Sequence, residues 1–265
     1  MTAETEDMAQ HPSSMSEFSL APDRSRFTFQ NNWFEWHRLA WEELMSPWVG
    51  KDVQILEVGA FEGASTTWML DNIMSNPKST MVVVDTFEGG MEHQTGPAEY
   101  QLASLEKRFW ANVSKCKEMH KLTVKKTRSE EALMVLRQES AVFDIIYIDA
   151  SHVAVDVLHD TVLCWRMLAV GGYLVFDDWR WKGYNENCYN PRVAIIAFLQ
   201  CVPQELKIVR ETEGQIWATK VPCRIQPTKN PDPDLYYWDE DDNPFASLWW
   251  KEAPQALLDA NGESS

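Results

Sequence analysis

The chain has 265 residues, of which 45% are hydrophobic, and its formal net charge is −16. This length suffices for one sizeable α/β domain with extensions. The excess of acids excludes the basic surface that nucleic acids and anionic membranes require, which favours a small-molecule partner and is compatible with a homo-oligomer. No apolar stretch approaches 18 residues, and the polar N-terminus lacks the zones of a signal peptide, so we expect a soluble cytoplasmic protein.

Composition divides the chain into three parts. Residues 1–25 are rich in Ser, Glu, Asp and Pro and predict a disordered leader. Residues 26–220 carry the periodic apolar pattern of a single domain. Residues 221–265 form an acidic, Trp-containing C-terminal extension, with nine acids against three bases. This extension either docks on this chain or a partner, or is a mostly solvated tail.

Apolar periodicity predicts an alternation of helices and strands. A helix over 32–48 comes first; strands follow at 53–58, 81–84, 121–126, 143–148 and 172–176, and helices lie between them at 63–74, around Leu105 and Trp110, at 129–136 and at 153–168. In the last of these helices, Val155, Leu158, Val162 and Trp165 are expected to share the buried face. A helix at 191–199 precedes a hairpin of strands 206–210 and 215–219. This order predicts a Rossmann-like, doubly wound and mainly parallel α/β sheet with a terminal antiparallel hairpin.

A glycine-bounded turn follows the first strand, in the sequence Glu57-Val58-Gly59-Ala60-Phe61-Glu62-Gly63. In doubly wound sheets, nucleotides bind at such a turn because its backbone and the helix N-terminus can approach the ligand. The spacing is not GxGxxG, and two acids in the turn suit an ammonium-bearing ligand better than a pyrophosphate. Asp85, at the end of the second strand, is placed to accept hydrogen bonds from a ribose. The alternative is a tight turn and a solvated loop acid.

Three carboxylates follow two strands that we expect to be neighbours. Asp149 follows the fourth strand, and Asp177 and Asp178 follow the fifth. Converging carboxylates repel one another unless a cation lies among them, and oxygen ligands suit a hard divalent ion such as Mg²⁺. Alternatively, these acids cap helices or pair with Arg180 and Arg192. His152 can reach the same pocket and take a proton near neutral pH, or it is an ordinary helix-terminal histidine.

Together these motifs resemble the class I S-adenosylmethionine-dependent methyltransferases, and within them the group similar to macrocin O-methyltransferase. The resemblance covers roughly residues 54–199 and rests on the order of six motifs. They are Glu57-x-Gly59-x-x-x-Gly63-x-Ser65-Thr66, Val84-Asp85-Thr86-Phe87, Asp149-x-x-His152 with Asp160, Gly171-Gly172, Asp177-Asp178-Trp179 and Pro191-Arg192-Val193-Ala194.

The resemblance implies roles for these residues. Glu57, Gly59 and Gly63 would hold the methionine part of the cofactor, and Asp85 would hold its ribose. Ser65 would also bind the cofactor, and Arg128 and Ser129 would lie beside the adenine. Asp149, Asp177 and Asp178 would hold the metal, so that Asp149 serves cofactor, metal and catalysis, and His152 would be the base. Residues 26–220 would then be a methyltransferase domain that O-methylates a small molecule with S-adenosylmethionine and Mg²⁺ or another divalent cation. Two positions depart from the family pattern: Asp178 stands where relatives more often have Asn, and Thr127 where glycine is expected.

Three other functions are weighed against this one. A nicotinamide-dependent oxidoreductase shares the fold but lacks GxGxxG and leaves the three carboxylates unexplained. An N-methyltransferase acting on an amine or peptide remains open, because the cofactor motifs do not report the acceptor atom. A non-catalytic cofactor-binding scaffold, engaging a partner through residues 221–265, also remains open.

Overall fold

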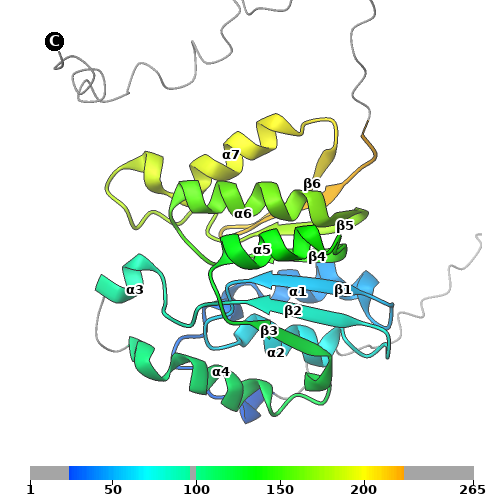
Figure 1. Cartoon of the computed structure of the whole chain (residues 1–265), viewed down its shortest axis with the longest axis vertical. Coiled ribbons are helices and arrows are strands. Elements are labelled where there is room, and N and C mark those ends of the chain that lie inside the picture. The colour runs from blue at the N-terminus through cyan, green and yellow to red at the C-terminus, as the bar shows by residue number, and fades with distance from the viewer. Residues whose placement is uncertain (1–23, 96–99, 224–265) are drawn as a thin grey trace, which may run out of the picture. The chain divides into compact units, whose positions relative to one another are not determined.

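The computed structural model describes residues 24–95 and 100–223 (Figure 1). Most of the expected leader and nearly all of the C-terminal extension therefore lie outside the described residues. None of the described helices is long and apolar enough to cross a membrane.

The described residues form a seven-stranded sheet in the order β3-β2-β1-β4-β5-β7-β6. Strands β1 to β5 are parallel, and β7 lies antiparallel between β5 and β6. The predicted mainly parallel sheet with a terminal antiparallel hairpin is confirmed. The strands are β1 (Gln54–Val58), β2 (Thr80–Val84), β3 (Leu122–Lys125), β4 (Phe143–Ile148), β5 (Leu168–Phe176), β6 (Leu206–Glu211) and β7 (Ile216–Lys220).

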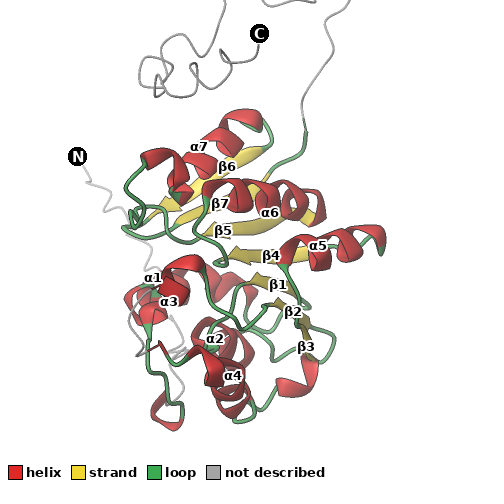
Figure 2. Cartoon of the chain, turned by 60° about the vertical axis from the view of Figure 1, so that its left-hand side comes forward, coloured by secondary structure: helices red, strands yellow, loops and turns green. Residues whose placement is uncertain are grey.

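Helices cover both faces of the sheet (Figures 1 and 2). Neighbouring side chains on β1 point to opposite faces, so Ile55 packs in one core with Trp41 and Trp68, and Leu56 in the other with Trp165. The first core belongs to α1, α2 and α4, and the second to α5, α6 and α7. The helices are α1 (Arg38–Met45), α2 (Ala64–Asn72), α3 (Met91–Thr95), α4 (Leu105–Val113), α5 (Ser129–Gln138), α6 (Ala154–Met167) and α7 (Pro191–Cys201).

Three elements differ from their sequence prediction. The expected helix over 32–48 is a 3-10 turn (Trp33–Trp36), then α1, then a second 3-10 turn (Ser46–Trp48), because Pro47 lacks the N–H that would continue α1. Strand β5 begins four residues earlier than expected, at Leu168. The predicted inner face of α6 is wrong for Val155 and Val162, whose exposed fractions are 67% and 46%.

The correction in α6 has a packing reason. Short side chains, Thr161 and Cys164, lie buried beneath the helix together with Val157. These residues follow the helical period and define the buried face, so Val155 and Val162 lie off that face and are exposed to solvent.

The carboxyl ends of four parallel strands lie level with one another. Val58 at the end of β1 pairs with Val84 of β2 and with Ile148 of β4, which in turn pairs with Phe176 of β5. The first residues beyond these ends are Gly59, Asp85, Asp149 and Asp177. All four therefore meet at one edge of the sheet, where this class of fold binds its ligands.

Candidate active site

A cavity of about 730 Å³ lies at this edge of the sheet. The turn after β1, the ends of β2, β4 and β5, helix α3 and residues of the segment 31–37 all contribute to its lining. Of the residues expected to bind cofactor or metal, Glu57 and Gly63 do not line it. Those that do are Gly59, Ser65, Asp85, Arg128, Ser129, Asp149, Asp177 and Asp178.

Gly59 occupies a position that only glycine fits. Its φ is +89°, and a Cβ atom placed there would lie 2.0 Å from the carbonyl oxygen of Asp149. The missing side chain lets the turn after β1 pack directly against the end of β4, which brings the glycine turn and Asp149 into one cavity.

Both acids of the glycine turn have partners within the protein. Glu57 is fully buried beneath the start of α2, where the hydroxyls of Ser65 and Thr66 donate to its two oxygens. Burial raises the pKa of Glu57 to about 8, in spite of these hydrogen bonds. Glu62 accepts from Arg108 Nε at 3.0 Å and from the backbone N–H of Gln30 at 2.6 Å. Glu57 thus fixes the start of α2 from behind the cavity wall.

Asp85 ties the end of β2 to the turn after β1. One carboxylate oxygen accepts from the backbone N–H groups of Ala60 at 2.7 Å and Phe61 at 2.9 Å, and the other accepts from Phe87 at 2.6 Å. Burial raises the pKa of this carboxyl, and the three N–H groups oppose that shift. Asp85 nevertheless lines the cavity, so its expected contact with a ribose stays a prediction.

Arg128 and Ser129 lie at the start of α5, on the same cavity. The exposed Arg128 side chain pairs with Glu130 at 2.6 Å. The start of α5 thus faces the cavity.

Asp149, His152 and Asp178 each offer one ligand atom, and these three atoms lie within 4.8 Å of one another. The Nε2 atom of His152 is 2.7 Å from an oxygen of Asp178, a residue whose backbone is in the left-handed region (φ +59°). Two of the three carboxylates predicted to hold a metal therefore come together, and His152 joins them. The alternative pairing with arginines is not present, because Arg180 contacts Glu211 and Arg192 lies over the Trp179 ring.

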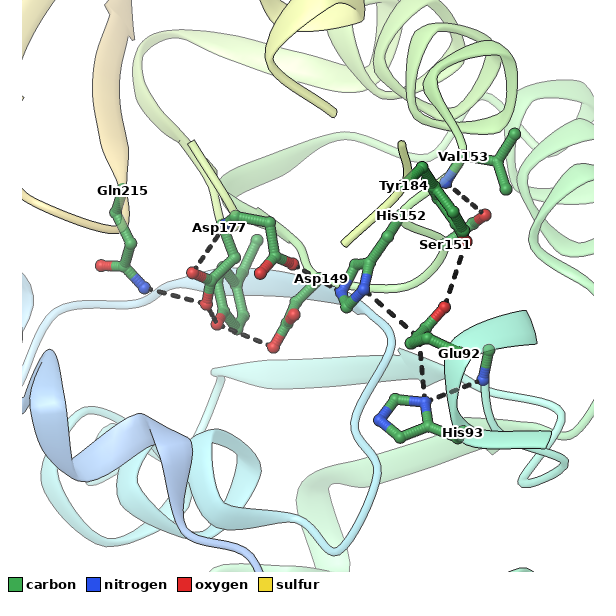
Figure 3. A network of polar contacts seen from close by, with 12 residues as sticks. Glu92, His93, Asp149, Ser151, His152, Val153, Asp177, Tyr184 and Gln215 are labelled. Atoms are coloured by element: carbon green, nitrogen blue, oxygen red, sulfur yellow. Dashed lines mark hydrogen bonds and ion pairs between the residues drawn. The ribbon is translucent and has the colours of Figure 1, made fainter. Parts of the chain in front are cut away.

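Asp177 makes a different set of contacts (Figure 3). It accepts hydrogen bonds from the Tyr147 hydroxyl and from Gln215 Nε2 at 3.1 Å, and His37 Nε2 lies 3.6 Å from its other oxygen. The same Tyr147 hydroxyl is 2.9 Å from Asp149 Oδ2. Burial, followed by repulsion from the neighbouring carboxylates, raises the pKa values of Asp149 and Asp177.

A glutamate from α3 completes the surroundings of His152. Glu92 Oε1 is 3.3 Å from His152 Nδ1, and Tyr184 donates its hydroxyl to Glu92 Oε2 at 3.2 Å (Figure 3). Burial alone would lower the pKa of His152, but the hydrogen bond to Asp178 and the charges of Asp178 and Glu92 outweigh it and raise that pKa. The Trp181 ring lies against the imidazole, 4.5 Å between centroids.

Sequence reasoning missed three residues of this network. Glu92 lies in a segment with no predicted site residue, and no spacing motif distinguishes it. Gln215 was assigned only to the hairpin. Tyr147 did carry a signal, because residues two apart on a strand share a face and a buried tyrosine hydroxyl needs a partner; Asp149 is that partner.

Fold and site together define a class I S-adenosylmethionine-dependent methyltransferase, as the motif order implied. Residues 56–179 match the family described as "Methyltransferase domain". Among curated proteins, no sequence matches this one significantly.

Solved structures of O-methyltransferases share the fold at low identity. The calicheamicin methyltransferase CalS11 is 16% identical with a TM-score of 0.50, over 68% of this chain and 77% of that one. MycE, from the mycinamycin biosynthetic pathway, is 12% identical with a TM-score of 0.50, over 72% of this chain and 51% of that one. TomG from Streptomyces achromogenes is 16% identical with a TM-score of 0.47, over 64% and 73%.

Proposed function

We propose that this enzyme transfers the methyl group of S-adenosylmethionine to a hydroxyl oxygen of a small molecule, with a divalent cation such as Mg²⁺ held by Asp149 and Asp178. The observation that carries the proposal is the convergence of Asp149, His152 and Asp178 in the same cavity as the glycine turn and Asp85.

The cavity suits the cofactor. Gly59 exposes backbone at the switch point of the sheet, and Asp85 offers carboxylate oxygens at the end of β2. Arg128 and Ser129, at the start of α5, also line the cavity. When bound, S-adenosylmethionine supplies an electrophilic methyl group on sulfur. The contribution of this chain is to hold cofactor and acceptor in line, which by itself removes a large part of the barrier.

The acids at the ends of β4 and β5 suit a cation. They supply hard oxygen donors, and the upward shift in the pKa of Asp149 reflects burial and repulsion that a positive charge would relieve. Mg is present in the MycE structure together with SAH and mycinamycin VI, which supports the choice of ion. A bound divalent cation supplies a Lewis acid that orients an acceptor oxygen and lowers its pKa. We also propose Asp177 as a third ligand of the cation, which requires its side chain to rotate away from Tyr147.

His152 is the base in this proposal. Its imidazole can accept the proton of an acceptor hydroxyl only in its neutral form, and the carboxylates of Asp178 and Glu92 favour the charged form. If Asp178 binds the cation instead of His152, the Nε2 atom of His152 becomes free and the imidazole shifts towards its neutral form. Substituting His152 with Ala should therefore slow turnover while S-adenosylmethionine still binds.

Calorimetric titration with S-adenosylmethionine in the presence of Mg²⁺ tests the cofactor. Saturable binding to the wild type, weakened at least tenfold in Asp85→Ala, is expected. Asp52→Ala is the matched control, because Asp52 is an exposed acid before the opposite end of β1. Absence of binding to the wild type would refute the proposal.

Chelation tests the role of the cation once turnover on an acceptor has been found. Removal of divalent ions with EDTA should abolish methyl transfer, and Mg²⁺ should restore it in the wild type but not in Asp149→Asn. Full activity in EDTA would refute the metal-assisted route.

A further inference from the structure

One side of the cavity has an aromatic wall, built from Trp33, Phe61, His93, Tyr100 and Trp181. Four of these rings contact one another: Phe61 and His93 stack at 5.0 Å, Trp33 lies 5.2 Å from Phe61, and Tyr100 meets His93 at 4.9 Å. Trp181 continues the wall beyond His152. Aromatic faces of this kind carry negative charge density and attract cations.

The lining is strongly acidic. Among the described residues that line the cavity, nine are Asp or Glu and one, Arg128, is Arg or Lys. Arg128 lies at the start of α5, where its exposed guanidinium already pairs with Glu130. An anionic group beside the aromatic wall would therefore meet carboxylates and no free guanidinium or ammonium group of the described lining.

Glu92 differs from the other acids because it lies between the aromatic wall and His152. Its contacts are with the two histidines and Tyr184, and its Oε1 atom and His152 Nδ1 are both buried without a hydrogen-bond partner. Burial opposes ionisation, but the contact with His93 and the charge of His152 outweigh it and lower the pKa of Glu92 to about 2. The cavity thus presents a carboxylate next to the aromatic rings.

We propose that the acceptor bears an amine, held by Glu92 against the aromatic wall, and carries no phosphate or carboxylate near the hydroxyl that is methylated. This inference rests on the proposed function, since it names the substrate class of the same cavity. An ammonium group gains from both the carboxylate and the rings in a partly desolvated site, whereas an anion is repelled by both.

Three phenols that differ only in the charge of their tail test the proposal: tyramine, tyrosol and 4-hydroxyphenylacetate. Their dissociation constants are measured by ligand-observed NMR on the SAH-saturated protein with Mg²⁺. We expect tyramine to bind at least ten times more tightly than 4-hydroxyphenylacetate, with tyrosol between them. Equal affinities, the reverse order, or no binding of tyramine at millimolar concentration would overturn the proposal.

The variant Glu92→Gln assigns the effect to one side chain. It should reduce the preference for the amine over the carboxylate at least fivefold, whereas Glu139→Gln, an exposed acid outside the cavity, should preserve it. An unchanged preference in Glu92→Gln would overturn the role of this residue. Should that variant not fold, the order of the three probes on the wild type still decides the proposal.

The proposed function and this inference fail in different measurements. Absence of SAH binding in a separate titration counts against the methyltransferase reaction. The charge preference is read from the probes with SAH and again without it, so it stands or falls independently of that result.

Discussion

Replacement of Glu57 by glutamine probes the buried acid that anchors the start of α2. The carboxyl of Glu57 has a pKa of about 8 in the folded chain against 4.5 in its ordinary surroundings, because burial disfavours the charged form. The folded state therefore binds the proton more tightly than the unfolded state does. Its contribution to stability is fully present below pH 4.5 and is lost as the pH rises through 8.

The size of the effect follows from the two pKa values. Integration of proton linkage between pH 7 and pH 9 gives a loss of roughly 1.4 kcal/mol of unfolding free energy, with little further change above pH 9. Glutamine does not titrate, so the variant should lose about 1.4 kcal/mol less than the wild type over this range. The comparison uses the change with pH, so a constant packing cost of the substitution cancels.

Urea denaturation at pH 7 and pH 9 measures this change in the cofactor-free protein. Glu139→Gln serves as the control, because that acid is exposed at the end of α5 and should leave the pH dependence as in the wild type. A wild type and a Glu57→Gln variant that lose the same stability between the two pH values would show that Glu57 is not held protonated in the fold.

Three further substitutions test the edge of the sheet. Tyr147→Phe leaves buried oxygens of Asp149 and Asp177 without their shared donor, so urea denaturation should show a loss of about 1–3 kcal/mol, and an unchanged midpoint would contradict the contacts. Gly59→Ala puts a Cβ atom against the Asp149 carbonyl, so S-adenosylmethionine should bind at least tenfold more weakly by calorimetry; retained affinity would argue against the close approach. Asp160 is buried, and burial raises its pKa to about 6, so its contribution to stability is lost as the pH rises through 6. Asp160→Asn should therefore lose less stability than the wild type between pH 4 and pH 8, and an equal fall in melting temperature in the two proteins would contradict this.

The strands and their order along the chain follow from sequence because each reads as a short run of apolar, often β-branched residues between turns. Val53 to Val58 and Phe143 to Ile148 are such runs, and both were placed within a residue of β1 and β4. The face that a helix buries is harder to predict. In α6 apolar side chains occur on more than one face, so periodicity alone does not distinguish the exposed Val155 from the buried Val157.

In the site, too, residues placed by local sequence could be predicted, whereas residues placed by long-range contacts could not. Asp85 and Asp149 could be placed because each follows a strand directly, and parallel strands end at one edge. Glu92 could not, because it reaches His152 from a short helix whose position depends on its contacts across the cavity. No period or motif in the sequence encodes that approach.

For the three carboxylates at the ends of β4 and β5, electrostatic repulsion predicts that a positive charge is needed but does not predict which oxygen atoms bind it. Their mutual repulsion predicts a compensating charge, but the fold already supplies part of the compensation. Asp178 has His152, and Asp177 has Gln215. The Tyr147 hydroxyl has a single proton to share between Asp149 and Asp177, so one of these two contacts requires a second proton on a carboxyl group. Asp149 is thus the acid with the least compensation from the protein, and it is there that a bound cation would gain most.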